Sequence, residues 1–147
     1  MENAFSSLPV RERIIVALDC SAARARELAG LLEGHATWLK VGMTLYYAEG
    51  PSIVEELRAR GFHVFVDLKF HDIPHQVQGA ARAVACVGAD MMTMHAAGGT
   101  AMMEAGVRGI EEGAATREGG KPPISLAITV LTSMDADALA AAGVTRV

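Results

Sequence analysis

The fold is indicated most directly by the stretch Phe62-His63-Val64-Phe65-Val66-Asp67-Leu68-Lys69-Phe70-His71-Asp72-Ile73-Pro74. Its first part, through Leu68, is mostly apolar and rich in valine and phenylalanine, and it is too short for a helix, so it predicts a strand over residues 62–68. Charged residues follow at once. Beyond them Val77, Ala81 and Val84 recur at helical spacing. The stretch therefore predicts a strand, a polar turn and an amphipathic helix.

The same order of elements recurs on both sides of this stretch. Further strands are predicted over residues 14–18, 37–41, 89–94 and 124–130, and the final residues, 144–147, resemble the opening of a sixth strand. The intervening segments carry helical patterns, whose apolar positions are Ala25, Leu28, Leu31 and Leu32; Ile53, Val54 and Leu57; Met103, Val107 and Ile110; and a run over residues 136–142. Ser21 offers an N-cap to the first of these helices, and Pro51 a start to the second.

Strands that alternate with helices require crossover connections, and hence a parallel sheet. The sheet is either a closed barrel or an open, doubly wound sheet. The first strand-to-helix turn, Asp19-Cys20-Ser21, lacks the glycine pattern of a dinucleotide-binding open sheet. Charged residues follow several predicted strands, as they do at the active end of a barrel. We therefore predict an α/β fold, a parallel (β/α)8 TIM barrel.

The length of the chain bears on this prediction. A complete barrel takes roughly 200 to 250 residues, so the 147 residues here accommodate about five βα units. Residues 1–147 are expected to form a single barrel domain that is incomplete at its C-terminus.

The composition excludes several classes of partner. A formal net charge of −4 argues against a broad nucleic-acid or anionic membrane surface. No apolar run approaches the roughly 20 residues that cross a bilayer. The start of the chain lacks a signal peptide's apolar core, and only Cys20 and Cys86 are present, which predicts a cytoplasmic protein with reduced thiols.

The charges within the opening stretch are the strongest functional signal. Asp67 and Lys69 lie two residues apart, so on a strand their side chains point to the same face. Such a pair is either a structural ion pair or part of a site that faces ligand and water. Asp19 and Lys40, near the ends of the two preceding strands, extend it into an array of alternating charges. This convergence favours an active site.

The pattern Asp67-x-Lys69-x-x-Asp72-Ile73-Pro74 resembles the signature of orotidine 5′-monophosphate decarboxylases. Other segments agree with the same family in order along essentially the whole chain: Ala17-Leu18-Asp19, Leu39-Lys40-Val41-Gly42, His95-Ala96-Ala97-Gly98-Gly99 and Val130-Leu131-Thr132-Ser133-Met134. The resemblance implies decarboxylation of orotidine monophosphate (OMP) to uridine monophosphate (UMP) in de novo pyrimidine biosynthesis, without metal or cofactor.

The resemblance also implies roles for individual residues. Lys69 would stabilise the carbanion left at C6 and then donate a proton to it. Asp67 would lie beside the substrate carboxylate and orient Lys69. Asp72 would reach the site of a partner subunit, which implies a homodimer with shared active sites. Asp19 and Lys40 would lie around the ribose hydroxyls.

Four more residues complete the expected substrate site. Ile73 belongs to the signature itself. Gln76 stands where the family often has threonine, and His75 where it has asparagine, so the family's hydroxyl contact is not carried over to Gln76. Thr132 and Ser133 would bind the pyrimidine amide edge or, equally, cap the next helix.

A metal site is not expected. His71 and His75 have a spacing that could hold a metal on a helix, but Pro74 between them argues against helix there.

Two alternatives remain open. Sugar-phosphate enzymes of the same superfamily, such as keto-gulonate phosphate decarboxylase or hexulose phosphate synthase, share the Asp-x-Lys-x-x-Asp core and use Mg²⁺. Their signature usually continues with alanine or glycine, unlike Asp72-Ile73-Pro74. The other alternative is a noncatalytic fragment, because barrels bind phosphate through loops after strands seven and eight. We therefore expect the 147 residues alone to be nearly inactive and prone to aggregate.

Overall fold

A computed structural model describes residues 8–117 and 119–144 of the chain. Its strands form one sheet in the order β1-β2-β3-β4-β5, and every neighbouring pair is parallel. The strands are β1 (Ile15–Ala17), β2 (Trp38–Gly42), β3 (His63–Phe70), β4 (Met91–His95) and β5 (Ile124–Ile128). The predicted α/β class with parallel strands is confirmed.

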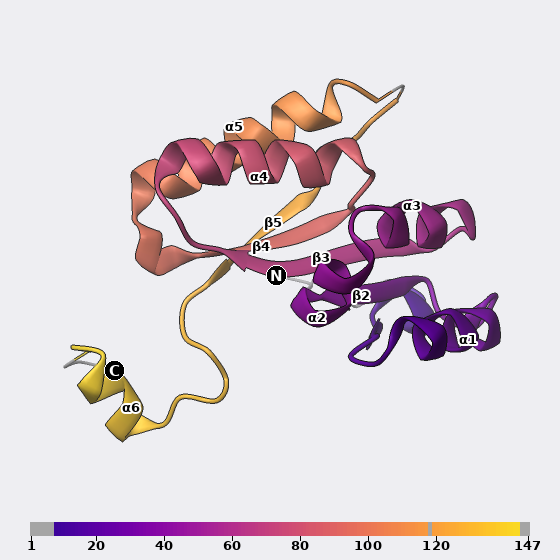
Figure 1. Ribbon diagram of the computed structural model, residues 1–147, viewed down its shortest axis with the longest axis horizontal. Coiled ribbons are helices and arrows are strands. Elements are labelled where there is room, and N and C mark those ends of the chain that lie inside the picture. Colours follow the sequence, from indigo (N-terminus) through magenta and orange to yellow (C-terminus); the bar gives the residue numbers. More distant parts are fainter. Residues whose placement is uncertain (1–7, 118, 145–147) are drawn as a thin grey trace.

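The helices alternate with the strands. They are α1 (Ala22–Leu32), α2 (Met43–Glu49), α3 (Ser52–Ala59), α4 (Pro74–Cys86), α5 (Thr100–Ala114) and α6 (Ala136–Ala141), with short 3-10 helices at Val10–Glu12 and Ala96–Gly98. Figure 1 shows α4 and α5 side by side along the sheet, while α6 stands apart at the end of an extended segment. Within the described residues, no helix is long and apolar enough to cross a membrane.

The core lies between the sheet and its helices. On β3 the side chains of Val64, Val66 and Leu68 are buried on the helix-covered face, whereas Phe65 and Asp67 alternate with them on the other face and are only partly buried. This period of two is the expected consequence of strand geometry. The face that carries Asp67 is thus left available for a site.

The starts and ends of several elements differ from prediction. β3 continues through Asp67 and Lys69 to Phe70 instead of ending at residue 68, and β5 ends at Ile128 instead of residue 130. Helix α2 was not predicted; only Leu45 of it is buried, so it has almost no apolar periodicity to detect. Of the predicted sixth strand, residues 145–147 lie outside the described residues.

The inward face of α5 was predicted wrongly in part. Ile110 is buried as expected, but Val107 is 41% exposed. The buried face instead includes Gly106, Gly109 and Gly113. A Cβ atom at Gly109 would meet the backbone of α4. Because glycine lets two helix backbones approach closely, small residues make up most of the buried face, beside Met102 and Ile110. On α1, Leu31 is likewise exposed.

The prediction that Pro74 keeps His71 and His75 from lying on one helix is confirmed. Helix α4 begins at this proline, a position where the missing N–H costs nothing. His75 therefore lies in the helix while His71 precedes it. The ring of His71 packs instead near His95 at the end of β4, with 5.1 Å between ring centroids.

Candidate active site

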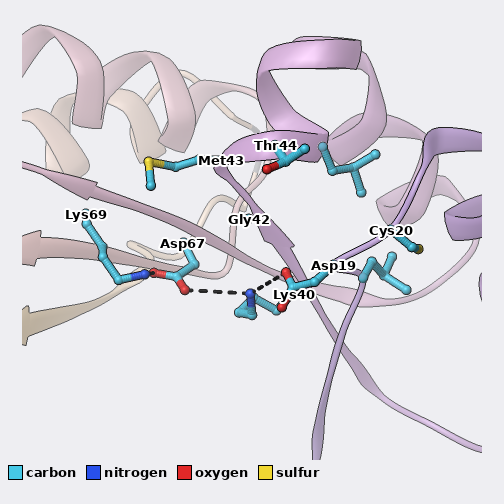
Figure 2. Close-up of a pocket in the computed structure, with 10 residues that line it drawn as sticks. Asp19, Cys20, Lys40, Gly42, Met43, Thr44, Asp67 and Lys69 are labelled. Atoms are coloured by element: carbon cyan, nitrogen blue, oxygen red, sulfur yellow. Dashed lines mark hydrogen bonds and ion pairs between the residues drawn. The ribbon is translucent and has the colours of Figure 1, made fainter. Parts of the chain in front are cut away.

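Four charged side chains from three neighbouring strands meet at the C-terminal end of the sheet. The parallel register pairs Ala17 with Lys40 and Gly42 with Asp67, so Asp19, just after β1, comes beside Lys40. The Nζ atom of Lys40 lies 2.9 Å from Oδ1 of Asp19 and 3.7 Å from Oδ2 of Asp67. Nζ of Lys69 lies 2.9 Å from Oδ1 of Asp67. Figure 2 shows this chain of alternating charges.

Asp67 is the least exposed member of this chain. Its side chain is 13% exposed, against 66% for Asp19. Burial by itself would raise the pKa of Asp67, but hydrogen bonds from Lys69 and Thr93 and the charges of Lys69 and Lys40 outweigh burial and lower its pKa. The carboxylate is therefore held in its charged form at neutral pH.

The backbone at Lys69 is unusual. Its φ angle is 52°, in the left-handed region, and it is the one residue other than glycine with a positive φ within the described ranges. Such a conformation costs of order 1–3 kcal/mol and is found mostly at functional sites. The pairing of β3 with β4 is irregular at the same place, because β3 advances from Val66 to Phe70 while β4 advances only from Met92 to Met94. A bulge thus aims Lys69 out of the sheet.

Sequence reasoning missed Thr93. This residue lies in β4 opposite the bulge and is 1% exposed. Its hydroxyl donates to Oδ1 of Asp67 at 2.9 Å and accepts from the backbone N–H of Lys69 at 2.9 Å. The available signal was a single threonine within the apolar run Met91-Met92-Thr93-Met94, since a buried hydroxyl must find a partner.

Asp67 and Lys69 lie between hollows in the surface. One hollow, of about 300 Å³, is also lined by Asp19 and Lys40 (Figure 2). Another, of about 380 Å³, is also lined by Thr132 and Ser133, which follow β5. Asp67 and Lys69 can therefore contact a ligand that extends across the sheet, from the side of β1 and β2 to the side of β5.

Gln76 and Asp72 line a third hollow, of about 340 Å³, together with Lys69. Even so, Asp72 does not reach the ammonium of Lys69: in residues 8–117 and 119–144 it takes part in no ion pair. Its Oδ1 instead accepts from the backbone N–H of Ile73 at 2.6 Å. Ile73, just before α4, is 63% exposed. The structure thus leaves Asp72 and Ile73 on the outer surface, beside the charge array and not within it.

His95 ends β4 close to this region. Burial is the main cause that lowers its pKa, and the charges of His71 and Lys69 act in the same direction. A neutral imidazole here can donate or accept a hydrogen bond without adding to the positive charge of Lys69.

Comparisons with known proteins agree with this geometry. A relative from Nitratidesulfovibrio vulgaris strain Miyazaki F, named orotidine 5′-phosphate decarboxylase, is 48% identical over 122 residues, which cover 80% of this chain and 49% of that protein. One of the same name from Maridesulfovibrio salexigens is 49% identical over 125 residues, which cover 84% of this chain and 53% of that protein. This chain thus spans about half the length of the curated relatives it matches.

Solved structures give the same result. A crystal structure of orotidine 5′-phosphate decarboxylase from Lactobacillus acidophilus superposes with a TM-score of 0.83 at 36% identity, covering 91% of this chain and 60% of that one. An uncharacterised conserved protein from Geobacillus kaustophilus gives a TM-score of 0.79 at 45% identity, covering 86% and 58%. The five parallel strands with their helices are accordingly part of a TIM barrel, as predicted.

The family model described as "Orotidine 5'-phosphate decarboxylase / HUMPS family" matches residues 12–147, nearly the whole chain. The matched residues include the charge array of Asp19, Lys40, Asp67 and Lys69. The chain belongs to the orotidine 5′-phosphate decarboxylase / HUMPS family.

Proposed function

We propose that this chain carries the decarboxylating part of an orotidine 5′-monophosphate decarboxylase site, a carboxy-lyase that acts in pyrimidine biosynthesis. The observation that carries the proposal is the array of Asp19, Lys40, Asp67 and Lys69 at the end of the sheet, with Lys69 bordering three hollows. The names of the relatives support the same reaction.

The chemistry assigned to Lys69 follows from the charge that the reaction creates. When the bond between C6 and the carboxylate breaks, its electron pair stays on C6 and CO2 departs. An ammonium beside C6 stabilises that negative charge and then transfers one proton to it, giving UMP. Asp67, ionised and next to Lys69, orients the ammonium and places negative charge near the substrate carboxylate. Neither metal nor cofactor is needed for these steps.

The hollows suggest how the nucleotide lies. Asp19 and Lys40 would bind the ribose hydroxyls in the first hollow. Thr132 and Ser133, across the hollow on the β5 side, would hydrogen-bond the pyrimidine amide edge. Gln76, beside Lys69, offers a further donor and acceptor. Together these contacts would place C6 near the ammonium of Lys69.

Asp72 and Ile73 fit a role in a second subunit. Both lie on the outer surface at the start of α4, and Asp72 is not paired with a lysine within the described part of the chain. We propose a cytoplasmic homodimer in which each protomer supplies Asp72 and Ile73 to its partner's site, completing an Asp-Lys-Asp array.

The phosphate is assigned to residues that this chain does not contain. Barrels bind phosphate through loops after strands seven and eight, whereas the described residues form one sheet of five strands, which we propose belongs to a single barrel domain. Strand β5 is at one edge of the sheet, and Ile124 and Leu126 on it are exposed. We propose that further strands cover this edge in the active enzyme.

The test is an OMP decarboxylation assay, followed by ultraviolet absorbance, on this chain and on a chimera that adds the C-terminal half of the Maridesulfovibrio salexigens relative. We expect activity in the chimera, little in the 147 residues alone, and a loss of about 10²- to 10⁴-fold or more with Lys69→Ala. Lys121→Ala, which removes an exposed lysine, is the control.

Two outcomes would contradict the proposal. One is turnover of a sugar phosphate with Mg²⁺ and none of OMP, which would favour the sugar-phosphate branch of the superfamily. The other is a Lys69→Ala chimera that decarboxylates OMP as fast as the parent.

A further inference from the structure

Thr93 is the one polar residue among the fully buried side chains of the described residues, at 1% exposed. It lies in β4 between Met92 and Met94, both of which point into the core. Burying a hydroxyl in an apolar core costs free energy unless it is hydrogen-bonded. The Thr93 hydroxyl makes two hydrogen bonds, one with Asp67 and one with Lys69.

The β3–β4 pairing explains why these bonds converge on Thr93. Because Val66 pairs with Met92 and Phe70 pairs with Met94, the segment Asp67-Leu68-Lys69 stands opposite Thr93 alone. The bulge takes the backbone N–H of Lys69 out of the regular hydrogen-bond ladder between the strands. This N–H instead donates a hydrogen bond to the hydroxyl of Thr93, at 2.9 Å. The Thr93 hydroxyl thus takes the place of the backbone carbonyl that would accept the N–H of Lys69 in a regular sheet, and Lys69 is the residue with a φ of 52°.

The same hydroxyl also fixes the carboxylate. It donates its only proton to Oδ1 of Asp67, the oxygen that also accepts from Nζ of Lys69. A closed ring of contacts results, from the Lys69 backbone through Thr93 and Asp67 to the Lys69 ammonium. Oδ2 of Asp67 is left to face Lys40. The threonine side chain is stiff about χ1, which suits it to hold both partners in one geometry.

We propose that Thr93 is a positioning residue, whose hydroxyl locks the bulged backbone of Lys69 and the carboxylate of Asp67 so that the ammonium is aimed at the reacting carbon. Thr93 does not itself touch the substrate in this proposal. The catalytic role given to Thr93 rests on the proposed decarboxylase function. The hydrogen bonds among Thr93, Asp67 and Lys69 do not depend on that function. A displacement of about 1 Å in a reacting group costs on the order of 10²-fold in rate, so a small shift of Lys69 has a measurable consequence.

The test compares three variants of this chain and of its chimera. Thr93→Val removes the hydroxyl at nearly constant shape, and Thr93→Ser keeps the hydroxyl and removes the methyl group. Thr116→Val is the matched control, because Thr116 donates a hydrogen bond to the carbonyl of Gly113 away from the site. Two kinds of measurement are made: the titration of the Asp67 carboxyl group by ¹³C NMR, which gives its pKa, and steady-state kinetics, which give kcat and KM for OMP.

We expect Thr93→Val to raise the pKa of Asp67 and to lower kcat about 10- to 100-fold while KM changes much less. Thr93→Ser should restore both quantities most of the way, and Thr116→Val should change neither. The proposal is overturned if Thr93→Val leaves the Asp67 titration and kcat unchanged, or if Thr93→Ser is as impaired as Thr93→Val, because packing of the methyl group would then be the cause.

The two readouts separate this inference from the proposed function. If no form decarboxylates OMP and Thr93→Val alone shifts the Asp67 titration, the positioning role stands and the decarboxylase function fails. If the parent decarboxylates OMP and Thr93→Val titrates and turns over like the parent, the function stands and the positioning role fails.

Discussion

The Nζ atom of Lys69 lies 2.9 Å from Oδ1 of Asp67 although the two residues belong to one strand and the backbone between them is bulged. In a regular strand two such side chains leave the same face side by side. Here the left-handed backbone at Lys69 changes the direction of its side chain, and the ion pair closes over the bulge. The distance between the two charged groups therefore depends on the bulge at the end of β3. A substitution of either residue is expected to break the ion pair.

Asp67→Asn is expected to impair turnover strongly. The substitution keeps the shape of the side chain but removes the charge that faces both Lys69 and Lys40. We predict that kcat falls by about 10²-fold or more, because the ammonium of Lys69 loses the partner that orients it. Steady-state OMP assays on the chimera measure this. Asp137→Asn, at an exposed position of α6, is the control. A kcat close to that of the parent would refute the assigned role.

The same carboxylate should give stability a specific dependence on acid. The pKa of Asp67 is lowered in the folded protein, so its ionised form contributes stability above the unfolded pKa of about 3.9, and this contribution is lost as pH falls through the folded pKa. We predict that unfolding free energy, from urea titrations, falls more steeply below about pH 4 in the parent than in Asp67→Asn. Parallel curves for the two proteins would show that Asp67 is not stabilised in its charged form.

The sequence predicted the sheet and most of the charge array because these depend on local patterns. Apolar runs that end in Asp19 and Asp67 mark the ends of parallel strands, and parallel strands bring their ends to one edge. The placement of Lys40 and Lys69 in the same array followed from the same reasoning.

What the sequence did not predict depends on contacts between distant residues. Thr93 contacts Asp67 and Lys69 because β3 bulges opposite it. No local sequence pattern predicts a bulge between Val66 and Phe70. Helix α2 has one buried residue, Leu45, and hence no period. The inward face of α5 is set by its approach to α4, which small residues permit.

A mixing experiment tests the shared site. If Asp72 acts in the partner's site, Asp72→Asn and Lys69→Ala subunits are each inactive alone, but a mixed dimer contains one site with both native residues. We predict that equal amounts of the two chimeras, unfolded and refolded together, regain about a quarter of the parent activity, since about half of the dimers are mixed and each has one of two sites intact. Activity no greater than that of the separate variants would place Asp72 and Lys69 in the same subunit's site or exclude Asp72 from the reaction.

The close approach of α4 and α5 gives a last prediction, on stability. A Cβ atom at Gly109 would collide with the carbonyl of Gln78 and crowd the amide of Arg82, and neither backbone group can move without displacing α4. We predict that Gly109→Ala lowers the free energy of unfolding by about 1–3 kcal/mol, the usual range for overpacking, as measured by urea denaturation. Gly79→Ala is the matched control, because Gly79 lies within α4 and nothing stands within 4 Å of its Cβ position. That substitution should be neutral or stabilise the protein by about 0.5–1 kcal/mol through helix propensity. Equal effects at the two positions would mean that α4 and α5 are not in backbone contact at Gly109.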